Sequence, residues 1–594
     1  MKLCCKHVVL ASQMQENADF YYSNRLQCRD QLQAMKNFSQ SDSLRVGVLY
    51  GLRRTGKTVL LKQWLQSLPY EERTKAAYIS VDAETMSDVK ADLRTLRENG
   101  YKYVALDEIT TCEDFIDRSA PLSDDFARSG MKLFIAGTDS LSVWFALNDT
   151  LFDRDTTLHT THIPFAEWSR LTQQSSLDEY IRWGGLLHLQ PTPGEIRHAA
   201  PLPWTANDAR DYFTSSISRN IQNSVRRYDE GIHAGLLEPL LEDPALCSAI
   251  YGLFGNVTRH EFISTLDVLA QMSDAERHAA LQSSVSHDTH AFSSTVMAKQ
   301  FRPPDLSRTV KIFGHRNERV YRILSDIATS LRGDAEKLLE IRTKNGSVIN
   351  DAQFIELENY LRRLEVLAMR PGKAFLPLHS SRDDAIQYKT FNDMLAAQNI
   401  VVQPGLRYAQ ADIVLSLLEQ DPDFEKFDES TQEEIKSVYI HGVYGIMQED
   451  IILYETMQKC KEYGSMKPWD NYTVDYASLP IIAYKAMFPR CKYDSKDKEI
   501  DMVIKDKESG KYYLVEIKHA EERHEQQSAW LRDDNVLNRL VHDRKKIASK
   551  TVLYRGDTRY EKGIAYVNTE EYLTVLHENG ITRAMALLSD KTAC

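Results

Sequence analysis

The sequence predicts a multidomain α/β protein, in which a parallel sheet near the N-terminus is followed by a mainly helical middle and by a second α/β domain. The chain has 594 residues, which is too many for one hydrophobic core, so three or four domains are expected. Short apolar runs that lead into helical patterns predict the parallel sheet, and two alternating runs at residues 498–504 and 511–518 predict the second sheet. The composition, with 42% hydrophobic and 27% charged residues, is typical of a soluble, folded protein.

The bulk properties exclude several classes of protein. No apolar run approaches the roughly 18 residues that a membrane helix needs, and the apolar part of the N-terminal segment is too short for a secretory signal. We therefore expect a cytoplasmic protein with no membrane partner. The eight cysteines include no Cys-x-x-Cys pair, which indicates reduced thiols rather than a zinc site or a disulfide framework. The net charge of −12 neither indicates nor excludes nucleic acid, because binding depends on where positive charges cluster.

A glycine-rich segment at residues 51–58 follows the first predicted strand, 44–50, and leads into a helical pattern. It fits G-x-x-x-x-G-K-[ST], and the order strand, loop, helix is the one that a phosphate-binding loop requires. Backbone amides and the helix N-terminus attract phosphate groups, Lys57 is expected to reach the β and γ phosphates, and the Thr58 hydroxyl is expected to bind Mg²⁺. The candidate nucleotide-binding residues of this loop are Gly51, Arg53, Arg54, Thr55, Gly56, Lys57 and Thr58.

Acidic and polar residues follow two further predicted strands. Asp107 and Glu108 come directly after the strand at residues 103–106, where they would bind Mg²⁺ and activate a water molecule, respectively. Thr138 follows the strand at residues 133–136, where a polar group could sense the γ phosphate, although a plain loop is the alternative. Since the sequence contains no Asn-Lys-x-Asp guanine reader, ATP with Mg²⁺ is the expected ligand.

The middle of the chain, from about residue 165 to 435, is mostly helical in pattern. Residues 351–369, for example, place apolar side chains at the spacing of an amphipathic helix. A helical lid followed by a small winged-helix-like module is the expected content, and such modules serve DNA binding and protein contacts equally well. The expected domains are an N-terminal helical flank at 1–43, a phosphate-loop core at 44–165, a helical lid at 166–300, a helical and winged-helix-like region at 301–435 and a second α/β domain at 436–594.

Acidic residues and a lysine lie along the two predicted strands near the C-terminus. If these strands pair through the polar hairpin at residues 505–510, Asp501, Glu516 and Lys518 can converge, since alternate side chains of a strand share a face. Carboxylates placed in this way bind one or two Mg²⁺ ions, and a lysine orients the water that attacks a phosphodiester. Glu449, at the start of an apolar helix, is a candidate for a further metal ligand. A surface hairpin with solvated charges is the alternative.

Two nearby patterns are weaker. Residues 434–436 repeat the Glu-x-Lys spacing in a polar helical stretch, so we interpret this copy as coincidental. A basic run after Lys518 could neutralise a phosphate backbone, although a solvated helix face explains it as well. The run comprises Arg539, Arg544, Lys545, Lys546 and Lys550.

Taken together, the motifs resemble those of the prokaryotic predicted AAA-type (P-loop) ATPases that carry a C-terminal restriction-endonuclease-like PD-(D/E)XK domain of uncharacterised function. The resemblance covers most of the chain. It rests on LYGLRRTGKTVLLKQW, VALDEI, FIAGTDSL, IPFAEW, the Trp-Gly-Gly run at 183–185, VYGIMQEDIILYET, EIDMVI and LVEIKHA.

The resemblance implies roles for individual residues. In the C-terminal domain it implies a chemically complete site made of Glu449, Asp501, Glu516 and Lys518. In the N-terminal domain the implied roles are phosphate binding for Lys57 and Thr58, magnesium and water for Asp107 and Glu108, γ-phosphate sensing for Thr138 or Asp139, and an arginine finger for Arg154.

Two functions remain open at this point. The first is ATP hydrolysis coupled to a magnesium-dependent nuclease that acts on DNA. The second is a nucleotide-dependent switch or binding protein whose nuclease-like domain recognises nucleic acid or protein without cutting. The sequence leaves the oligomeric state open.

Overall fold

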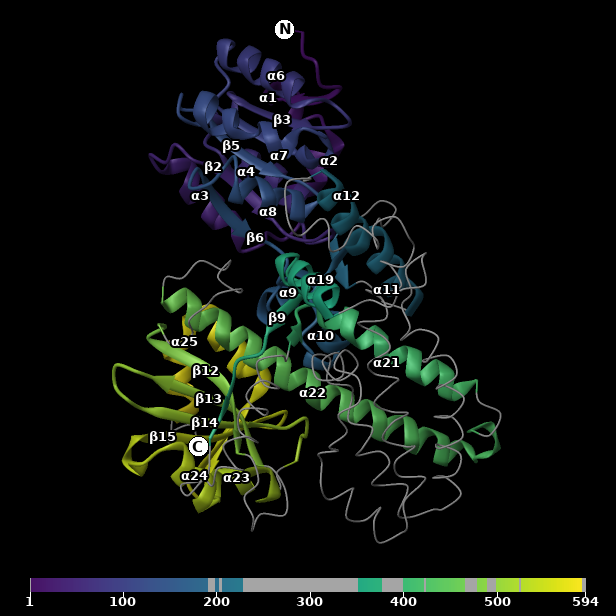
Figure 1. Cartoon of the computed structure of the whole chain (residues 1–594), viewed down its shortest axis with the longest axis vertical. Coiled ribbons are helices and arrows are strands. Elements are labelled where there is room, and N and C mark those ends of the chain that lie inside the picture. The colour runs from purple at the N-terminus through teal and green to yellow at the C-terminus, as the bar shows by residue number, and fades with distance from the viewer. Residues whose placement is uncertain are drawn as a thin grey trace.

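The protein is described by a computed structural model, in which an N-terminal domain and a C-terminal domain flank a set of connecting helices (Figure 1). The ranges described are 2–190, 198–201, 206–227, 351–375, 399–420, 424–464, 478–488, 498–522 and 525–589. Much of the expected lid and most of the expected winged-helix-like region therefore lie outside the described residues. None of the described helices is long and apolar enough to cross a membrane.

The N-terminal domain is built on a six-stranded sheet with the order β1-β3-β4-β5-β2-β6. Only β1 is antiparallel to its neighbour, and the other pairs are parallel. All residues of β2, β4 and β5 are buried, which explains why these strands appear in the sequence as continuous apolar runs. The strands are β1 (His7–Leu10), β2 (Val46–Tyr50), β3 (Ala76–Ser80), β4 (Tyr103–Asp107), β5 (Lys132–Ala136) and β6 (Asp155–His159).

Helices cover both faces of this sheet and enclose two hydrophobic cores. Close packing fixes β2 against β5, because a Cβ atom on Gly47 would lie 2.4 Å from the ring of Phe134. On the other face, α6 begins at a capping box in which the Thr85 hydroxyl and the Asp88 carboxylate satisfy each other's backbone N–H groups. The helices are α1 (Ala11–Met14), α2 (Ala18–Ser23), α3 (Gln31–Gln40), α4 (Lys57–Ser67), α5 (Tyr70–Arg73), α6 (Met86–Glu98), α7 (Phe115–Arg118) and α8 (Ser140–Asn148).

The C-terminal domain is built on a seven-stranded mixed sheet with the order β10-β12-β13-β14-β15-β17-β16. The long helices α22 (Glu429–Tyr463) and α25 (Thr569–Ser589) pack on one face, and the short helices α23 (Ala529–Arg532) and α24 (Asp534–Leu540) pack on the other. The strands are β10 (Gly372–Ala374), β12 (Ile481–Phe488), β13 (Lys498–Asp506), β14 (Tyr512–Ile517), β15 (Ile547–Tyr554), β16 (Arg559–Glu561) and β17 (Ile564–Asn568).

The structure places this domain's boundary earlier than residue 436. Strand β10 adds to the sheet from the expected middle region, and α22 begins at Glu429. The Glu-x-Lys copy at residues 434–436 lies within α22, as its polar helical pattern indicated.

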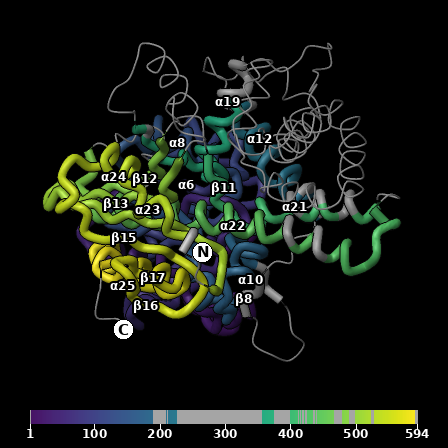
Figure 2. Tube along the Cα trace, turned by 90° about the horizontal axis from the view of Figure 1, so that it is seen from below, coloured from purple at the N-terminus to yellow at the C-terminus, as the bar shows by residue number. Residues whose placement is uncertain are grey.

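The described part of the expected lid, residues 166–190, 198–201 and 206–227, packs partly against the C-terminal domain. Helices α9 (Phe165–Thr172) and α10 (Leu177–Trp183) share one hydrophobic core with α22, α25 and the C-terminal sheet. Helix α21 (Pro404–Glu419) lies beside α22, and both extend away from that sheet (Figures 1 and 2). The other connecting elements are β7 (Leu187–Gln190), β8 (His198–Pro201), α11 (Ala206–Tyr212), α12 (Arg219–Arg227), α19 (Asp351–Arg363), β9 (Leu367–Met369) and β11 (Asn399–Val401).

Candidate nucleotide site and acidic centre

The phosphate-binding loop, residues 51–58, joins the end of β2 to the start of α4. Gly51 and Gly56 both have positive φ angles, 151° and 89°. Glycine is required at the first of these, because a Cβ atom there would lie 2.3 Å from Thr160 Oγ1. Gly56 is the residue that precedes α4, so the loop ends at a helix N-terminus. This geometry fits the binding of an anion.

Lys57 is the buried cation of the loop. Its Nζ atom donates to the carbonyl oxygens of Gly51, at 2.6 Å, and Leu52, at 2.7 Å. Burial lowers the pKa of Lys57 to about 8, although the charges of Glu108 and Asp107 act in the opposite direction. The ammonium is therefore held over the loop and beside the carboxylates that follow β4.

Asp107 and Glu108 lie at the carboxyl edge of the sheet. The hydroxyl of Tyr78 donates to Asp107 Oδ2 at 2.7 Å. Glu108 has a φ angle of 56°, and its Oε2 atom accepts a hydrogen bond from the backbone N–H of Thr138 at 3.1 Å. Burial and the charge of Asp107 raise the pKa of Glu108, as expected for a base kept in a partly dry site.

A cavity of about 360 Å³ contains most of the nucleotide-binding residues that the sequence predicts. Gly51 and Thr55 belong to the loop but are not among the residues that line the cavity. The Thr55 hydroxyl donates to Leu52 O within the loop at 2.9 Å. The predicted residues that line the cavity are Arg53, Arg54, Gly56, Lys57, Thr58, Asp107, Glu108 and Thr138. Its further lining residues are Leu26, Gln27, Arg29, Val59, Leu171 and Leu187.

Arg29 supports the loop from the N-terminal flank and was missed by the sequence analysis. Its guanidinium donates to Thr55 O at 2.6 Å and to Thr160 O at 3.1 Å, and it pairs with Glu167 at 2.7 Å. Both charged side chains are buried. No local pattern marks this arginine, because its partners lie between 26 and 138 residues away along the chain.

Arg154 lies away from the cavity. Its carbonyl oxygen accepts a hydrogen bond from Val46 N at the start of β2, whereas the phosphate-binding loop follows the end of that strand. Its guanidinium pairs with Asp124 at 2.9 Å. A full strand therefore separates Arg154 from the nucleotide cavity of its own chain, and its role as an arginine finger stays a prediction.

The acidic centre of the C-terminal domain forms where β13 and β14 separate. Their pairing extends no further than Met502 and Val515, and beyond it Asp501 Oδ2 accepts from the backbone N–H of Ile517 at 2.8 Å. Lys518 Nζ lies 2.7 Å from Asp501 Oδ2 and 2.8 Å from Glu516 Oε2. The structure therefore brings together the three residues that the strand alternation predicted.

Glu449 belongs to the same centre, but its immediate partner is a lysine. Lys485 of β12 places its Nζ atom 3.1 Å from Glu449 Oε2 and 3.2 Å from Glu499 Oε2. In the described part of the chain, no three His, Cys, Asp or Glu side chains are grouped closely enough to hold a metal ion. The acidic centre, defined as Glu449, Lys485, Glu499, Asp501, Glu516 and Lys518, thus alternates carboxylates with ammonium groups.

Two carboxylates of the acidic centre, those of Asp501 and Glu516, are placed to bind a divalent cation between them. Glu516 is buried, and its Oε1 atom has no hydrogen-bond partner among the described residues. Burial and the charge of Asp501 raise the pKa of Glu516 well above its ordinary value. A metal ion beside Asp501 and Glu516 would supply the missing partner and favour the ionised carboxylate.

Residues 44–169 match the family described as "AAA domain". This match identifies residues 44–169 as an AAA domain, the name used for this part of the chain below. Solved structures with partial similarity include C. elegans PCH-2, with 13% identity over 42% of this chain and 66% of that chain and a TM-score of 0.22. The S. cerevisiae Hsp104–ADP complex has 11% identity over 77% and 61%, with a TM-score of 0.24. The Walker-type ATPase paby2304 of Pyrococcus abyssi has 12% identity over 65% and 95%, with a TM-score of 0.23.

At these TM-scores the structural likeness carries no argument about substrate or partner. This chain also spans less than two thirds of the first two of those chains. No curated protein matches the chain.

The segment from Ile163 to Leu187, called the bridging segment below, contacts the phosphate-binding loop and the residue that follows Lys518 of the acidic centre. At its end, the backbone N–H of Leu187 donates to Arg54 O of the phosphate-binding loop at 2.9 Å. Near its middle, Asp178 Oδ1 lies 2.8 Å from Nε2 of His519, the residue after Lys518, and Asp178 also pairs with Arg555. Asp178 belongs to helix α10, and the rest of this helix and residues 184–186 lie between the two contacts.

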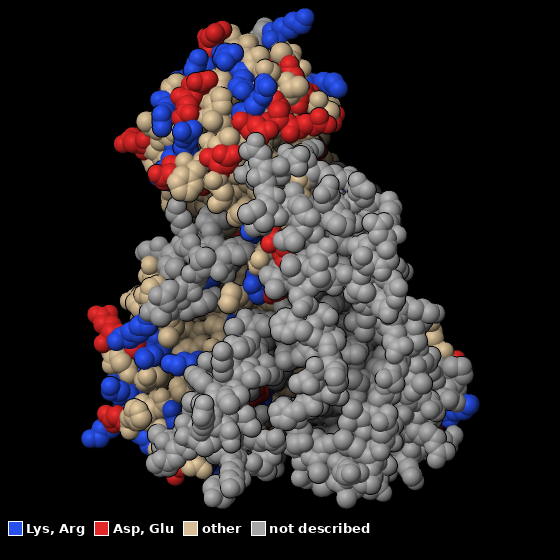
Figure 3. All heavy atoms as spheres, in the orientation of Figure 1, with Lys and Arg blue, Asp and Glu red and all other residues tan. Residues whose placement is uncertain are grey.

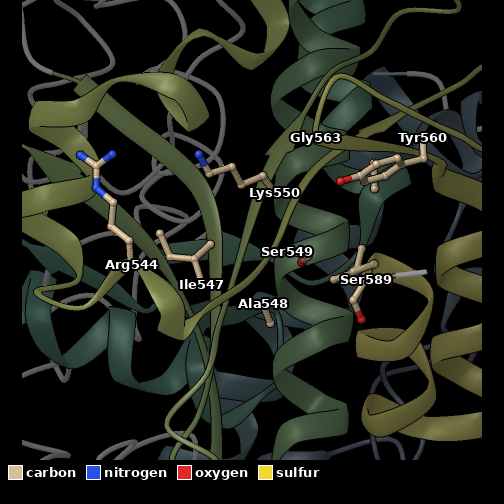
Figure 4. A pocket seen from close by; sticks show the side chains of 10 residues that line it. Arg544, Ile547, Ala548, Ser549, Lys550, Tyr560, Gly563 and Ser589 are labelled. Atoms are coloured by element: carbon tan, nitrogen blue, oxygen red, sulfur yellow. The ribbon is translucent and has the colours of Figure 1, made fainter. Parts of the chain in front are cut away.

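The basic run near the C-terminus does not line the acidic centre. Arg544 pairs with Asp534 at 2.6 Å, and together with Lys550 it lines a separate cavity of about 260 Å³ (Figure 4). This cavity lies at the start of β15, whereas Glu516 pairs with Val552 near the end of that strand. On the face shown in Figure 3, basic and acidic side chains both lie over the AAA domain, so this described part of the face is not uniformly basic.

Proposed function

We propose that the AAA domain binds and hydrolyses ATP with Mg²⁺ and thereby controls a nuclease-like C-terminal domain that acts on DNA. The observation that carries this proposal is the bridging segment, which touches the phosphate-binding loop through Leu187 and the residue after Lys518 through Asp178. A change in the loop on nucleotide binding or hydrolysis would be passed to the acidic centre by movement of α10.

The residues of the AAA domain support specific roles in hydrolysis. Lys57 and the loop amides would hold the β and γ phosphates, and Thr58 and Asp107 would hold Mg²⁺. Glu108 would position and deprotonate the attacking water, and Thr138 lines the same cavity. These assignments rest on the convergence of the residues in one cavity.

The residues of the acidic centre support phosphodiester chemistry. Asp501 and Glu516 would hold the divalent cation, which lowers the pKa of a bound water and stabilises negative charge on the phosphate. Lys518 would orient that water or stabilise the transition state.

The test measures both activities on one purified protein. Wild-type protein, Glu108→Gln and Glu516→Gln are assayed for ATP hydrolysis and for cleavage of linear, nicked and single-stranded DNA with Mg²⁺ or Mn²⁺. We expect Glu516→Gln to lose cleavage and keep ATP hydrolysis, and Glu108→Gln to lose hydrolysis. The nuclease part of the proposal is wrong if no DNA is cut and Glu516→Gln changes nothing.

A second candidate, a nucleotide-dependent binding protein that does not cut, is favoured by one observation. Two lysines already neutralise part of the acidic centre, and no group of three ligands is formed there. For this function we expect ATP to change the affinity for DNA or protein, without cleavage and without an effect of DNA on ATP turnover. The same assays therefore distinguish the two functions.

A further inference from the structure

Lys485 is a buried cation of the acidic centre. It is not part of the sequence pattern, Asp501, Glu516 and Lys518, from which this centre was predicted. Its side chain is 3% exposed, and its Nζ atom lies 3.1 Å from Glu449, 3.2 Å from Glu499 and 4.0 Å from Asp501. The β12–β13 register shifts around Lys485, and the residue's backbone N–H donates to Pro371 O at 2.9 Å. The backbone thus fixes this lysine at the point where three carboxylates meet.

The second lysine of the centre is placed differently. Lys518 is 31% exposed and lies between single oxygens of Asp501 and Glu516. Its ammonium can therefore rotate into solvent when a metal cation binds to Asp501 and Glu516. Lys485 has no such exit, because moving its charge from the three carboxylates into the surrounding core would leave it unpaired and buried.

The two lysines divide the carboxylates into two sets. Glu449 and Glu499 are neutralised by the fixed cation, while Asp501 and Glu516 face the exchangeable one. The buried oxygen without a partner, Glu516 Oε1, belongs to the second set. An incoming divalent ion would therefore find unsatisfied ligands at one place only.

We propose that the acidic centre takes a single divalent cation, between Asp501 and Glu516, and that Lys485 permanently occupies the place of a second cation and keeps Glu449 from binding metal. This inference deepens the proposed function and rests on it. It changes the role expected for Glu449, which becomes a positioning partner of Lys485 instead of a metal ligand.

The test is Mn²⁺ binding to the nucleotide-free, full-length protein, measured by isothermal titration calorimetry and by electron paramagnetic resonance of Mn²⁺. Glu516→Gln defines which ions belong to the acidic centre. We expect one Glu516-dependent ion per chain in the wild type. Because Glu449 pairs with Lys485, Glu449→Gln should change the affinity by less than about threefold, whereas Asp501→Asn, which removes a proposed ligand, should weaken binding by roughly tenfold or more.

Lys485→Met, which keeps the length and apolar character of the side chain, should expose Glu449, Glu499 and Asp501 to metal. We expect a second Mn²⁺ ion per chain, or at least tenfold tighter binding. The matched control is Lys498→Met, since Lys498 lies on β13 and pairs with Asp533 at 3.0 Å outside the centre. Circular dichroism checks that each variant is folded. If Lys485→Met does not fold, the Glu449→Gln titration decides alone.

The outcomes separate this inference from the proposed function. Two Glu516-dependent ions in the wild type, or a tenfold loss of affinity in Glu449→Gln, would overturn the one-metal inference and leave a metal-dependent domain in place. If no ion depends on Glu516, both the inference and the metal-dependent function fail.

Discussion

The side chains of Asp178 and His519 meet 2.8 Å apart, and they join helix α10 of the bridging segment to the residue that follows Lys518. Arg555 pairs with the same carboxylate, and the ring of Tyr444 stacks on His519 with centroids 5.1 Å apart. His519 is 7% exposed, so little water competes for this contact. The position of Lys518 is thereby tied to the bridging segment, which contacts the phosphate-binding loop through Leu187.

Replacing Asp178 with alanine should weaken this junction. Burial would raise the pKa of Asp178, but the hydrogen bond and charge of His519 and the charge of Arg555 hold it below its ordinary value of 3.8. The contact therefore stabilises the fold above about pH 3.8, and its contribution is lost as the pH falls through the lower pKa of the folded state. We expect Asp178→Ala to lower the free energy of unfolding by about 1 to 2 kcal/mol at pH 7, and by much less at pH 3.

The control for Asp178→Ala is Asp153→Asn, because Asp153 has a φ angle of 56°, which asparagine tolerates better than alanine. Asp153 pairs with Arg45 on the surface, where an ion pair contributes roughly 0.5 kcal/mol or less. Denaturant unfolding at both pH values measures the difference. Equal losses in the free energy of unfolding would show that the Asp178 contact contributes no more to stability than a surface ion pair does.

The parallel sheet of the AAA domain was predictable because its strands are buried on both faces. The runs at 44–50, 103–106 and 133–136 correspond closely to β2, β4 and β5. Strand β1 was not predicted, because it is short, half-buried and paired with a strand about 70 residues away. Local pattern carries little information about such an edge strand.

The nucleotide site and the acidic centre were predictable where their residues belong to short, local sequence patterns. The loop at 51–58, the pair Asp107 and Glu108, and the strands that carry Asp501 and Glu516 all have local signatures. Arg29 and Lys485 do not, because each meets its partners only through tertiary packing. The shared core of α9, α10 and the C-terminal domain escaped prediction for the same reason. The expected winged-helix-like module lies largely outside the described residues and stays a prediction.

Lys57→Ala should abolish measurable ATP binding. The variant loses the only ammonium among the lining residues of the nucleotide cavity, and a charge-assisted contact of about 3 kcal/mol corresponds to a loss of roughly 100-fold. Fluorescent nucleotide titration measures the affinity. Lys62→Ala, on the same helix α4, pairs with Asp19 instead and should bind ATP as the wild type does. Wild-type affinity in Lys57→Ala would overturn the assignment of the nucleotide site.

Glu108→Gln should separate binding from hydrolysis. Glutamine preserves the acceptor for Thr138 N–H but cannot take a proton from water, so we expect kcat for ATP to fall by about 100-fold or more while ATP affinity stays within about threefold. Phosphate release and nucleotide titration measure the two quantities. Glu113→Gln, an exposed residue shortly after the same strand, is the control. A variant that still hydrolyses ATP at the wild-type rate would remove Glu108 from the mechanism.

Arg29 and Glu167 should behave as a coupled pair that supports the phosphate-binding loop. Arg29→Ala leaves the Glu167 carboxylate buried without its partner, and we expect a loss of about 3 kcal/mol or more in stability. In the double variant with Glu167→Gln the loss should be smaller than the sum of the single losses, because no unpaired charge remains. A double-mutant cycle by denaturant unfolding measures this coupling. Strict additivity would contradict the pairing.

Glu455 should make the junction between α9 and α22 sensitive to pH. Its Oε1 atom accepts from the backbone N–H of Phe165 at 2.7 Å, and the side chain is buried. Burial raises the pKa of Glu455 to about 7, although the hydrogen bond from Phe165 and the nearby His577 and Lys459 lower it, while the charge of Glu167 raises it slightly.

The sign of the effect follows from the raised pKa. The folded state keeps the proton of Glu455 up to about pH 7, whereas the unfolded chain releases it near pH 4.5. The stability that this proton contributes is fully present below pH 4.5 and is lost as the pH rises to about 7, with an upper limit of about 3 kcal/mol. His577, whose pKa is raised by Asp30 in spite of burial, adds a loss of the same sign and remains in the variant.

Glu455→Gln should therefore flatten the fall in stability between pH 5 and 7.5 without removing it, because glutamine keeps an acceptor for Phe165 N–H and does not titrate. Denaturant unfolding midpoints at pH 5, 6, 7 and 8 measure the two profiles. Glu462→Gln, an exposed residue of the same helix that pairs with Lys459 at 2.8 Å, should leave the wild-type profile unchanged. Parallel profiles for the wild type and Glu455→Gln would mean that Glu455 is ionised in the folded protein at pH 5, and that burial at this junction is offset by its neighbours.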